Sequence, residues 1–318
     1  MNSLVLNRHA LAIGGAAAML AGCGGSQPPI GTPGAIAHGS GYRSAASPAS
    51  SGDLLYVAAN GNSYILTYPK ADLVGTIKGG AVGACSDSAG DVFLTQGLSV
   101  NEYAHGATSP SRSLTVPNES VGCAVDPTTG NLAVTYFWTS GSDVAIFKAA
   151  SSTPTLYGAP VDASYCGYDN HGDLFVDGTS RSFSLGLAEL AQSKSSFIVL
   201  STPESISGNE GSVQWDGTSM TVQVGVSSGR ETMRIYRFSV SGSSASIIGV
   251  THFSGIRRAS GPSWILGNRV IVPFGRQDII LNDLGFWKYP RGKAPVSTFK
   301  NAVRTQMNAI TVSVGTSH

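Results

Sequence analysis

The sequence predicts an all-β domain assembled from repeated units of four strands. Charged residues make up only 12% of the 318 residues, while glycine alone contributes 40. Low charge with abundant Gly, Ser and Thr is typical of many short strands joined by tight turns. One strand–turn–strand pattern recurs along the chain, and the C-terminal segment resembles a strand that the first unit lacks. Together these observations predict a closed, repetitive sheet architecture.

The amino terminus has the order of an export signal. Arg8 and His9 precede a short apolar run over residues 10–20, and two small residues follow it. The export machinery reads such a segment, and its apolar run is too short to span a bilayer permanently. Residues 1–22 are therefore predicted to be a cleavable signal peptide.

The end of this segment, Leu20-Ala21-Gly22-Cys23, resembles the lipobox of bacterial lipoproteins. The resemblance implies cleavage before Cys23, a diacylglycerol on its sulfur and an acyl chain on its new amino group. Each buried methylene contributes about 0.8 kcal/mol, so several chains hold a protein stably at a membrane. The alternative is that Cys23 is an ordinary buried cysteine in a hydrophobic helix.

Two further expectations concern the address of the mature chain. Gly24, rather than Asp, follows the cysteine, which in Gram-negative bacteria resembles cargo forwarded to the outer membrane. The chain is expected to be exported and held by its lipid at the outer membrane or on the periplasmic side of the envelope. Residues 23–52 consist mainly of Gly, Ser, Pro and Ala, too few large apolar residues to fold, and are predicted to be a lipid-anchored flexible tether.

The body, residues 53–318, contains the repeat. Its clearest copies read as a strand, an Asp-led turn, Gly-Asp or Gly-Asn, and a second strand; they are residues 82–94, 121–134 and 165–176. Asp side chains accept from turn amides and Gly supplies a positive φ, so each copy predicts a β-hairpin. Weaker copies cover residues 214–224 and 263–272, whereas residues 54–57 form a second strand with no first strand before it.

A second recurring feature places an apolar residue three before another, usually aromatic, residue in each third strand. The pairs are Ile65 and Tyr68, Val100 and Tyr103, Val144 and Phe147, Leu187 and Leu190, Ile235 and Phe238, and Phe286 and Tyr289. Six units spaced by about 44 residues match the four-stranded blades of a six-bladed β-propeller. Residues 307–313 align with the first strand at residues 82–88, so the C-terminal strand is predicted to close the first blade and remove an open edge.

Over residues 53–313 the repeats resemble the NHL-like six-bladed β-propellers of exported bacterial proteins. The strand start that carries the likeness, Gly-Asp-Leu-Phe-Val over residues 172–176, is widespread among propellers. The resemblance implies the fold and leaves the function open.

Three cysteines, Cys85, Cys123 and Cys166, fall in the first strands of successive units. Export permits one disulfide with one thiol left over. Inner strands of neighbouring blades diverge, however, and often exceed the Cα separation of about 7 Å at which bridging fails. The favoured interpretation is small buried residues packing between blades. No histidine or carboxylate pattern accompanies them, so neither a metal nor another cofactor is predicted.

Two motifs that suggest chemistry are better explained by turns. His171 lies in a turn whose counterparts in other units lack histidine, which favours turn chemistry over a calcium or acid/base cluster. Residues 225–229 fit the letters of Gly-x-Ser-x-Gly but lie between two predicted strands, whereas a nucleophile elbow precedes a helix. Lactonase-type propellers hold calcium with channel Glu, Asn and Asp, and amidating lyases use channel histidines; neither set is matched. A lactonase-like or lyase-like enzyme with a divergent channel site remains the alternative function.

The favoured function is binding or scaffolding through one face, made by the loops between second and third strands and the linkers between units. The candidate ligand-binding residues there are Tyr136, Trp138, Arg181, Arg230, Arg257 and Arg276, accompanied by Phe137, Phe274, Arg258 and Arg304. Aromatic rings and arginines are enriched at binding surfaces, although arginines also favour loops and Trp138 could cap a blade. The expected partner is an envelope protein or a small-molecule ligand, or a fixed envelope assembly. A net charge of +1 gives no reason to expect nucleic acid.

Overall fold

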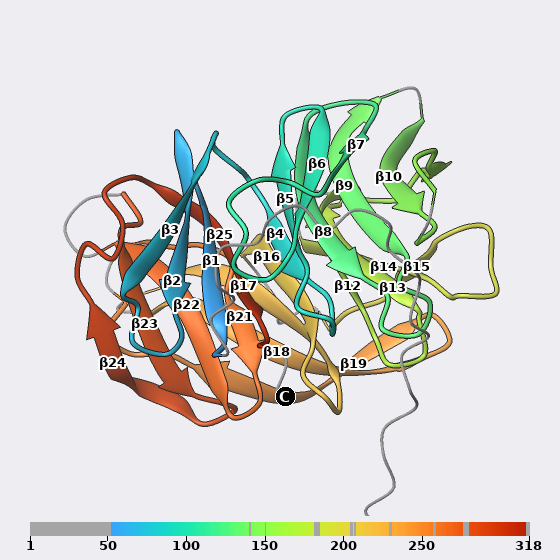
Figure 1. Ribbon diagram of the computed structural model, residues 1–318. Helices are drawn as coiled ribbons and strands as arrows, with labels where there is room; N and C mark the ends of the chain where they lie inside the picture. The colour runs from blue at the N-terminus through green and yellow to red at the C-terminus, as the bar shows by residue number, and fades with distance from the viewer. Residues whose placement is uncertain are drawn as a thin grey trace, which may run out of the picture. The chain divides into compact units, whose positions relative to one another are not determined.

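The computed structural model describes residues 52–315 except 140, 150, 181–184, 204–205, 207, 229–230, 257–258 and 276–279. Within these residues the secondary structure is entirely β and forms six sheets (Figure 1). Across the same residues, no helix is long and apolar enough to cross a membrane. The predicted all-β class is therefore confirmed.

Each sheet is one blade, and its strands follow one another from the channel outward. Blade 1 contains β25 (Met307–Ser313), β1 (Leu54–Ala59), β2 (Asn62–Thr67) and β3 (Leu73–Lys78). Blade 2 contains β4 (Ala84–Ser86), β5 (Val92–Gln96), β6 (Ser99–Tyr103) and β7 (Arg112–Thr115). Blade 3 contains β8 (Ser120–Val125), β9 (Leu132–Thr139), β10 (Ser142–Phe147) and β11 (Thr155–Tyr157).

The second half of the ring repeats this order. Blade 4 contains β12 (Asp162–Tyr168), β13 (Leu174–Thr179), β14 (Leu185–Leu190) and β15 (Ile198–Leu200). Blade 5 contains β16 (Asn209–Trp215), β17 (Met220–Ser228), β18 (Glu231–Ser241) and β19 (Ser244–His252). Blade 6 contains β20 (Ala259–Ser260) and β21 (Trp264–Leu266), which both pair with β22 (Arg269–Gly275), and then β23 (Asp283–Lys288) and β24 (Gly292–Phe299).

The ring closes as the sequence predicts. The C-terminal strand β25 is the inner strand of blade 1 and pairs antiparallel with β1, with Leu54 opposite Ser313 and Tyr56 opposite Thr311. The two lie side by side as the red and blue strands of Figure 1. Inner strands β25, β4, β8, β12, β16 and β21 contact one another in turn, and β21 returns to β25. The six-bladed count and the closure of the first blade by the C-terminal strand are both confirmed.

The core lies between blades. The described residues form six apolar clusters, one for each pair of neighbouring blades. Strand β1 shows why, because all six of its residues are buried and successive side chains point to opposite faces. Leu55 and Val57 pack toward blade 6, while Leu54 and Tyr56 pack toward blade 2. Because β1 is buried on both faces, its sequence is a continuous run of apolar residues.

The Asp-led turns form the hairpins between first and second strands. Asp126 Oδ1 accepts the backbone N–H of Thr128 at 2.8 Å, and Asp169 Oδ1 accepts those of His171 at 2.8 Å and Asp173 at 3.0 Å. Gly172 has φ +83°, which a side chain would disfavour. His171 itself is an exposed turn residue, its Nδ1 3.4 Å from Asp169 Oδ2. The prediction of turn chemistry is confirmed, and we call the side of the ring that carries these turns the hairpin face.

Candidate functional site

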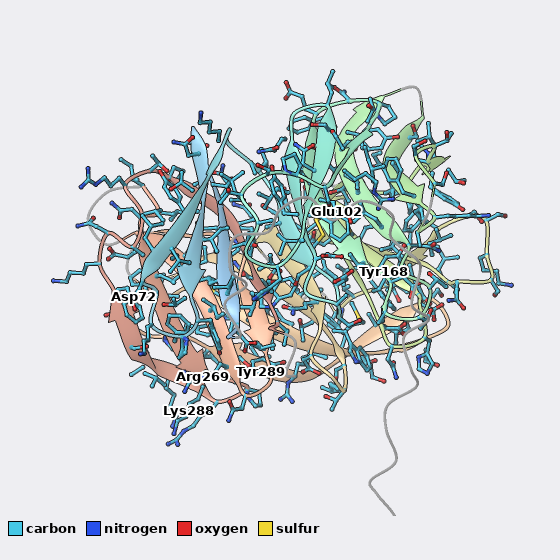
Figure 2. The ribbon with its side chains drawn as sticks, viewed as in Figure 1. Asp72, Glu102, Tyr168, Arg269, Lys288 and Tyr289 are labelled. Atoms are coloured by element: carbon cyan, nitrogen blue, oxygen red, sulfur yellow. A yellow bond between two sulfur atoms is a disulfide. The ribbon has the colours of Figure 1, made fainter. Side chains whose placement is uncertain are left out.

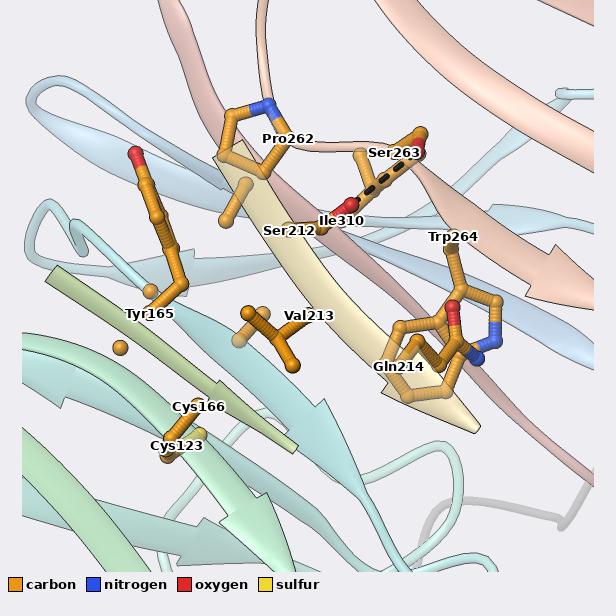
Figure 3. Close-up of a pocket in the computed structure, with 14 residues that line it drawn as sticks. Cys123, Tyr165, Cys166, Ser212, Val213, Gln214, Pro262, Ser263, Trp264 and Ile310 are labelled. Atoms are coloured by element: carbon orange, nitrogen blue, oxygen red, sulfur yellow. Dashed lines mark hydrogen bonds between the residues drawn. The ribbon is translucent and has the colours of Figure 1, made fainter. Parts of the chain in front are cut away.

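The inner strands enclose a narrow central cavity. The volume of this cavity that water can enter is about 40 Å³. That is enough for a small number of water molecules. Its polar lining includes Ser212, Gln214 and Ser263, and the Oγ atoms of the two serines lie 3.1 Å apart (Figure 3). Gln214 exchanges two hydrogen bonds with the backbone of Ile265 in the next blade, at 2.8 and 2.7 Å. Gln214 of the channel wall is thus engaged in joining blades, whereas the Nε1 of Trp264, which also lines the cavity, has no hydrogen-bond partner among the described residues.

A set of buried polar side chains on second strands links each blade to the next; we call these the clasp residues. They are Thr95, Thr135, Asp177 and Gln223 in blades 2 to 5. Thr135 Oγ1 accepts from Gly122 N in its own blade at 2.8 Å and donates to Ser164 O of blade 4 at 2.7 Å. Thr95 makes the corresponding bonds from blade 2 to blade 3.

The other two clasp residues use longer side chains. Asp177 accepts from Tyr165 N in its own blade at 3.1 Å and from Gly211 N of blade 5 at 3.0 Å. Gln223 donates to Gly261 O at 2.9 Å and accepts from Ser263 N at 2.7 Å, both in blade 6. In blades 3, 4 and 5 the first strand has an irregular register opposite the clasp residue. This irregularity leaves backbone groups for the clasp side chain to satisfy.

Asp177 is the one carboxylate among the clasp residues, and it is fully buried. Burial raises the pKa of its carboxyl well above the usual value; the backbone N–H groups of Gly211 and Tyr165 oppose that rise, and nearby Glu210 adds to it. Because both oxygens serve as acceptors for backbone amides, the geometry assigns Asp177 a structural role. A lactonase-like site would need a carboxylate that faces a ligand in the channel. Asp177 does not supply it, because its two oxygens face backbone N–H groups.

The clasp residues were not predicted from the sequence, although a signal for them exists. Three of the four come directly after a three-residue apolar start of a second strand, as in Val92-Phe93-Leu94 before Thr95, and Gln223 follows Met220-Thr221-Val222. Four copies place a polar residue at this one register, whereas blades 1 and 6 carry Ala58 and Pro273 there. A polar residue repeated at a position buried in every blade indicates a satisfied internal hydrogen bond.

Cys85 and Cys123 form a disulfide between blades 2 and 3, with their Cα atoms 5.7 Å apart. The favoured expectation of unbridged packing residues was wrong for this pair. Gly83, just before β4, explains the close approach: a Cβ at this position would collide with the backbone oxygen of Val121 in β8. Cys166 is a free, buried thiol. Burial raises its pKa far above the ordinary value, which suppresses the nucleophilic thiolate.

Loss of this disulfide should lower stability by about 3–4 kcal/mol, as expected for a crosslink closing a loop of this length. We expect Cys85→Ser with Cys123→Ser, or reduction of the wild type, to shift the urea midpoint downward. Cys166→Ser is the matched control and should leave the effect of reductant unchanged. An equal midpoint with and without reductant would contradict the bridge.

The structure corrects one predicted site residue and leaves the others untested. Tyr136 is fully buried, and its hydroxyl donates to Ser142 Oγ at 2.7 Å. It presents no surface to a ligand, because β9 continues to Thr139 instead of ending before Tyr136. Phe274, named beside it, is also buried. Trp138 lies in β9, but its side chain is outside the described part of the structure.

The remaining predicted residues are Arg181, Arg230, Arg257 and Arg276, with Arg258 beside them. All of them, and the lipid-anchor residue Cys23, lie outside the described residues. Arg304 is described and exposed. The residues of the Gly-x-Ser-x-Gly match that are described belong to β17, which pairs with β18 through Ser228 opposite Glu231. The described residues of the match thus form a strand paired with the next strand, as expected, and do not lead into a helix as a nucleophile elbow does.

Exposed apolar side chains lie on the side of the ring built by second-to-third-strand loops and interblade linkers, which we call the loop face. Val82, Leu98 and Phe137 are exposed there by 45%, 56% and 60%. Backbone hydrogen bonds connect the segments that carry them: Val82 N to Thr95 O, Ser120 N to Gly97 O, and Phe137 N to Glu119 O. The segments that carry the three side chains are therefore neighbours on the loop face of blades 2 and 3, and we call the three residues the apolar row.

Neither metal chemistry nor a sequence relative points to a particular activity. No group of three His, Cys, Asp or Glu side chains suited to a metal ion is found among the described residues. No protein-family model matches the chain, and no curated protein matches it.

Solved structures, in contrast, resemble the chain over most of its length. A nidogen/laminin complex contains a chain with TM-score 0.65 and 11% identity, matching 84% of this chain and 100% of its own. A protein of unknown function from Bacteroides caccae has TM-score 0.61 and 12% identity, over 82% and 99% of the two chains. The β-propeller domain of Cps50 (Swd1) from Myceliophteria thermophila has TM-score 0.54 and 12% identity, over 78% and 83%. At these identities the likeness establishes the fold alone: the chain is a six-bladed β-propeller.

Proposed function

We propose that the protein is an exported, lipid-anchored propeller that binds a protein partner in the cell envelope through its loop face. The observation that carries this proposal is the apolar row, Val82, Leu98 and Phe137. Large apolar side chains gathered on one exposed face mark interaction sites more often than isolated ones do. Aromatic residues in particular supply rigid contact area at interfaces.

The channel wall supports a binding role for the outer surface. Clasp residues and the Gln214 bonds join neighbouring blades through buried hydrogen bonds. A framework held in this way keeps its loops in fixed relative positions. Binding propellers use such frameworks to present loops from several blades together.

The sequence before the propeller supports the location. Residues 20–23 resemble a lipobox, and residues 24–52 have the composition of a tether. A lipid on Cys23 and a flexible tether would keep the propeller close to the membrane while leaving it free to meet an envelope partner.

The binding role is tested by comparing three forms of the tagged full-length protein crosslinked in native membranes. We expect Leu98→Ser with Phe137→Ser to lose a crosslinked partner that the wild type captures in fixed ratio. Ile248→Ser is the matched control, since Ile248 is 55% exposed on the outer strand β19, away from the loop face. Capture that is equal for all three forms would refute the proposal, provided that their melting temperatures agree.

The anchor makes a separate prediction. Cys23→Ser should abolish incorporation of labelled palmitate and move the protein from the membrane to the soluble fraction, because no thioether can form at serine. Cys166→Ser should leave both properties unchanged, since Cys166 is buried in the propeller. Persistent labelling of the Cys23→Ser form would disprove lipidation at this residue.

A further inference from the structure

A second cavity lies between blades 3 and 4 on the hairpin face. The volume of this cavity that water can enter is about 190 Å³, compared with about 40 Å³ in the central cavity. It is lined by the β8–β9 and β12–β13 hairpins, the ends of β10 and β14, and strand β11. Gln192 Nε2 donates to Thr128 Oγ1 across the two blades at 2.8 Å and fixes one wall against the other. The cavity is therefore a pre-formed part of the fold.

Two tyrosines contribute unused hydrogen-bonding groups to the cavity. Tyr168, at the end of β12 and labelled in Figure 2, is only 8% exposed. Among the described residues its hydroxyl has no hydrogen-bond partner, although it lines the cavity. Burial raises its pKa, so the hydroxyl stays a neutral donor. Tyr157 stands on the facing blade, held edge-on against Phe197 with ring centroids 6.4 Å apart. The Tyr168 hydroxyl is not among the enclosed, unpaired polar atoms of the described residues, so it is open to a ligand or water in the cavity that it lines.

The charge at the rim favours an anion. Lys148 and Lys194 line the cavity from blades 3 and 4, and both are exposed. Within the described part of the chain, neither lysine has a carboxylate within 4.0 Å. The one acid in the lining, Asp126, already accepts from Thr128 N and Oγ1 at 2.8 Å and from Thr129 Oγ1. These bonds hold the carboxylate in the turn without removing its charge, so the lining carries two ammonium groups against one carboxylate, an excess of one positive charge.

The rest of the lining suits a ligand with one apolar face. Ile146, Leu174 and Leu190 add aliphatic surface beside the tyrosine rings, while Asn131 and Thr155 add polar groups. Sugar rings combine an apolar face that stacks on aromatic side chains with hydroxyls that pair with tyrosine and amide groups. A hydroxylated ring with one negative charge matches all these features together.

We propose that this cavity binds a sugar acid of hexuronate size, with its carboxylate between Lys148 and Lys194 and its hydroxyls on Tyr157 and Tyr168. The site is separate from the loop face and does not depend on the proposed partner binding. It would let the hairpin face recognise an acidic saccharide, as a free molecule or as the end of a chain.

Calorimetric titration of the purified full-length protein tests this proposal, with sodium glucuronate as the probe. Glucuronate should bind, and glucose, which lacks the charge, should bind at least about tenfold more weakly, as expected for loss of charge-assisted hydrogen bonds. Sulfate, which lacks the ring, should also bind at least about tenfold more weakly. No heat from glucuronate, or equal affinity for glucose or sulfate, would overturn the proposal.

Variants then place the ligand in the cavity. Lys148→Gln with Lys194→Gln should weaken glucuronate binding about tenfold or more, and both sites are exposed, so folding should be unaffected. Tyr168→Phe should weaken it about fivefold through loss of one neutral hydrogen bond. Lys300→Gln, an exposed lysine in the linker after β24, is the matched control and should bind as the wild type does. Unchanged affinity in the double lysine variant would refute the site.

Discussion

Deletion of residues 307–318 is expected to unfold the propeller. Strand β25 pairs with β1 along its length, and its side chains Met307, Ile310 and Val312 are buried. Burial of each of these three side chains contributes about 1.5–3 kcal/mol. Their combined contribution approaches the unfolding free energy of a typical domain, which is about 5–15 kcal/mol. The deletion would also leave β1 with an unpaired edge and open the ring at blade 1.

Loss of cooperative thermal unfolding and of near-ultraviolet circular dichroism, with rapid proteolysis, would measure this outcome. The matched control ends the chain after Gly315, which keeps β25 and the hydrogen bond from Gly315 N to Asp53 Oδ1 at 3.0 Å. That form should melt as the wild type does. A chain lacking β25 that melts cooperatively at the wild-type temperature would show that the ring does not depend on its C-terminal strand.

Replacement of Asp177 should cause the largest loss of stability from a single side chain. Asp177→Ala leaves the buried N–H groups of Tyr165 and Gly211 without acceptors, at about 1–3 kcal/mol for each group. We therefore expect a loss of about 2–6 kcal/mol in urea unfolding. Thr135→Val is the matched control. It removes the hydrogen bonds of an uncharged clasp residue at the equivalent position, and its loss of unfolding free energy should be smaller.

The same residue predicts a pH dependence. Burial raises the folded-state pKa of Asp177 above the value of an unfolded chain, about 3.9. The folded state then holds more protons than the unfolded state in the interval between the two values. The stability contributed by this group is therefore fully present below about pH 4 and is lost as the pH rises through the folded-state pKa.

Asp177→Asn isolates this effect, since asparagine carries no titrating proton. The difference in unfolding free energy between wild type and Asp177→Asn should change with pH over that interval, in favour of Asn at the higher pH. Comparing the two proteins at each pH cancels the effect on stability of other acids whose pKa is also raised. One of these is Asp91, where burial raises the pKa to about 6. A difference that does not vary with pH would show that burial leaves the pKa of Asp177 unshifted.

Features carried by short segments were predictable. Asp-led hairpins depend on neighbouring residues, because one side chain and one glycine determine the turn. The number of blades follows from counting copies, and ring closure follows from finding the missing first strand at residues 307–313. The inferences about blade number and ring closure come from comparing one repeated unit of the sequence with another.

The candidate site was less predictable, because strand ends depend on pairing partners. The repeat over residues 121–134 placed Tyr136 in the loop after a second strand, but β9 continues to Thr139 because Ser120 pairs with Tyr136 and Ser142 with Thr139. Alternation along that added length turns Tyr136 into the core and Phe137 outward. Of these two aromatic residues predicted on the loop face, Phe137 is exposed there and Tyr136 is buried.

By itself the sequence determined the fold class, the six repeated units, their turn chemistry and the closing strand, since periodicity and turn residues are local properties. Only the tertiary structure decided which residues of neighbouring blades meet. The Cys85–Cys123 bridge, the clasp residues and the cavity with Lys148 and Lys194 each join two blades. Such contacts depend on how closely the inner strands approach and how the sheets twist past one another, and no single repeat encodes either.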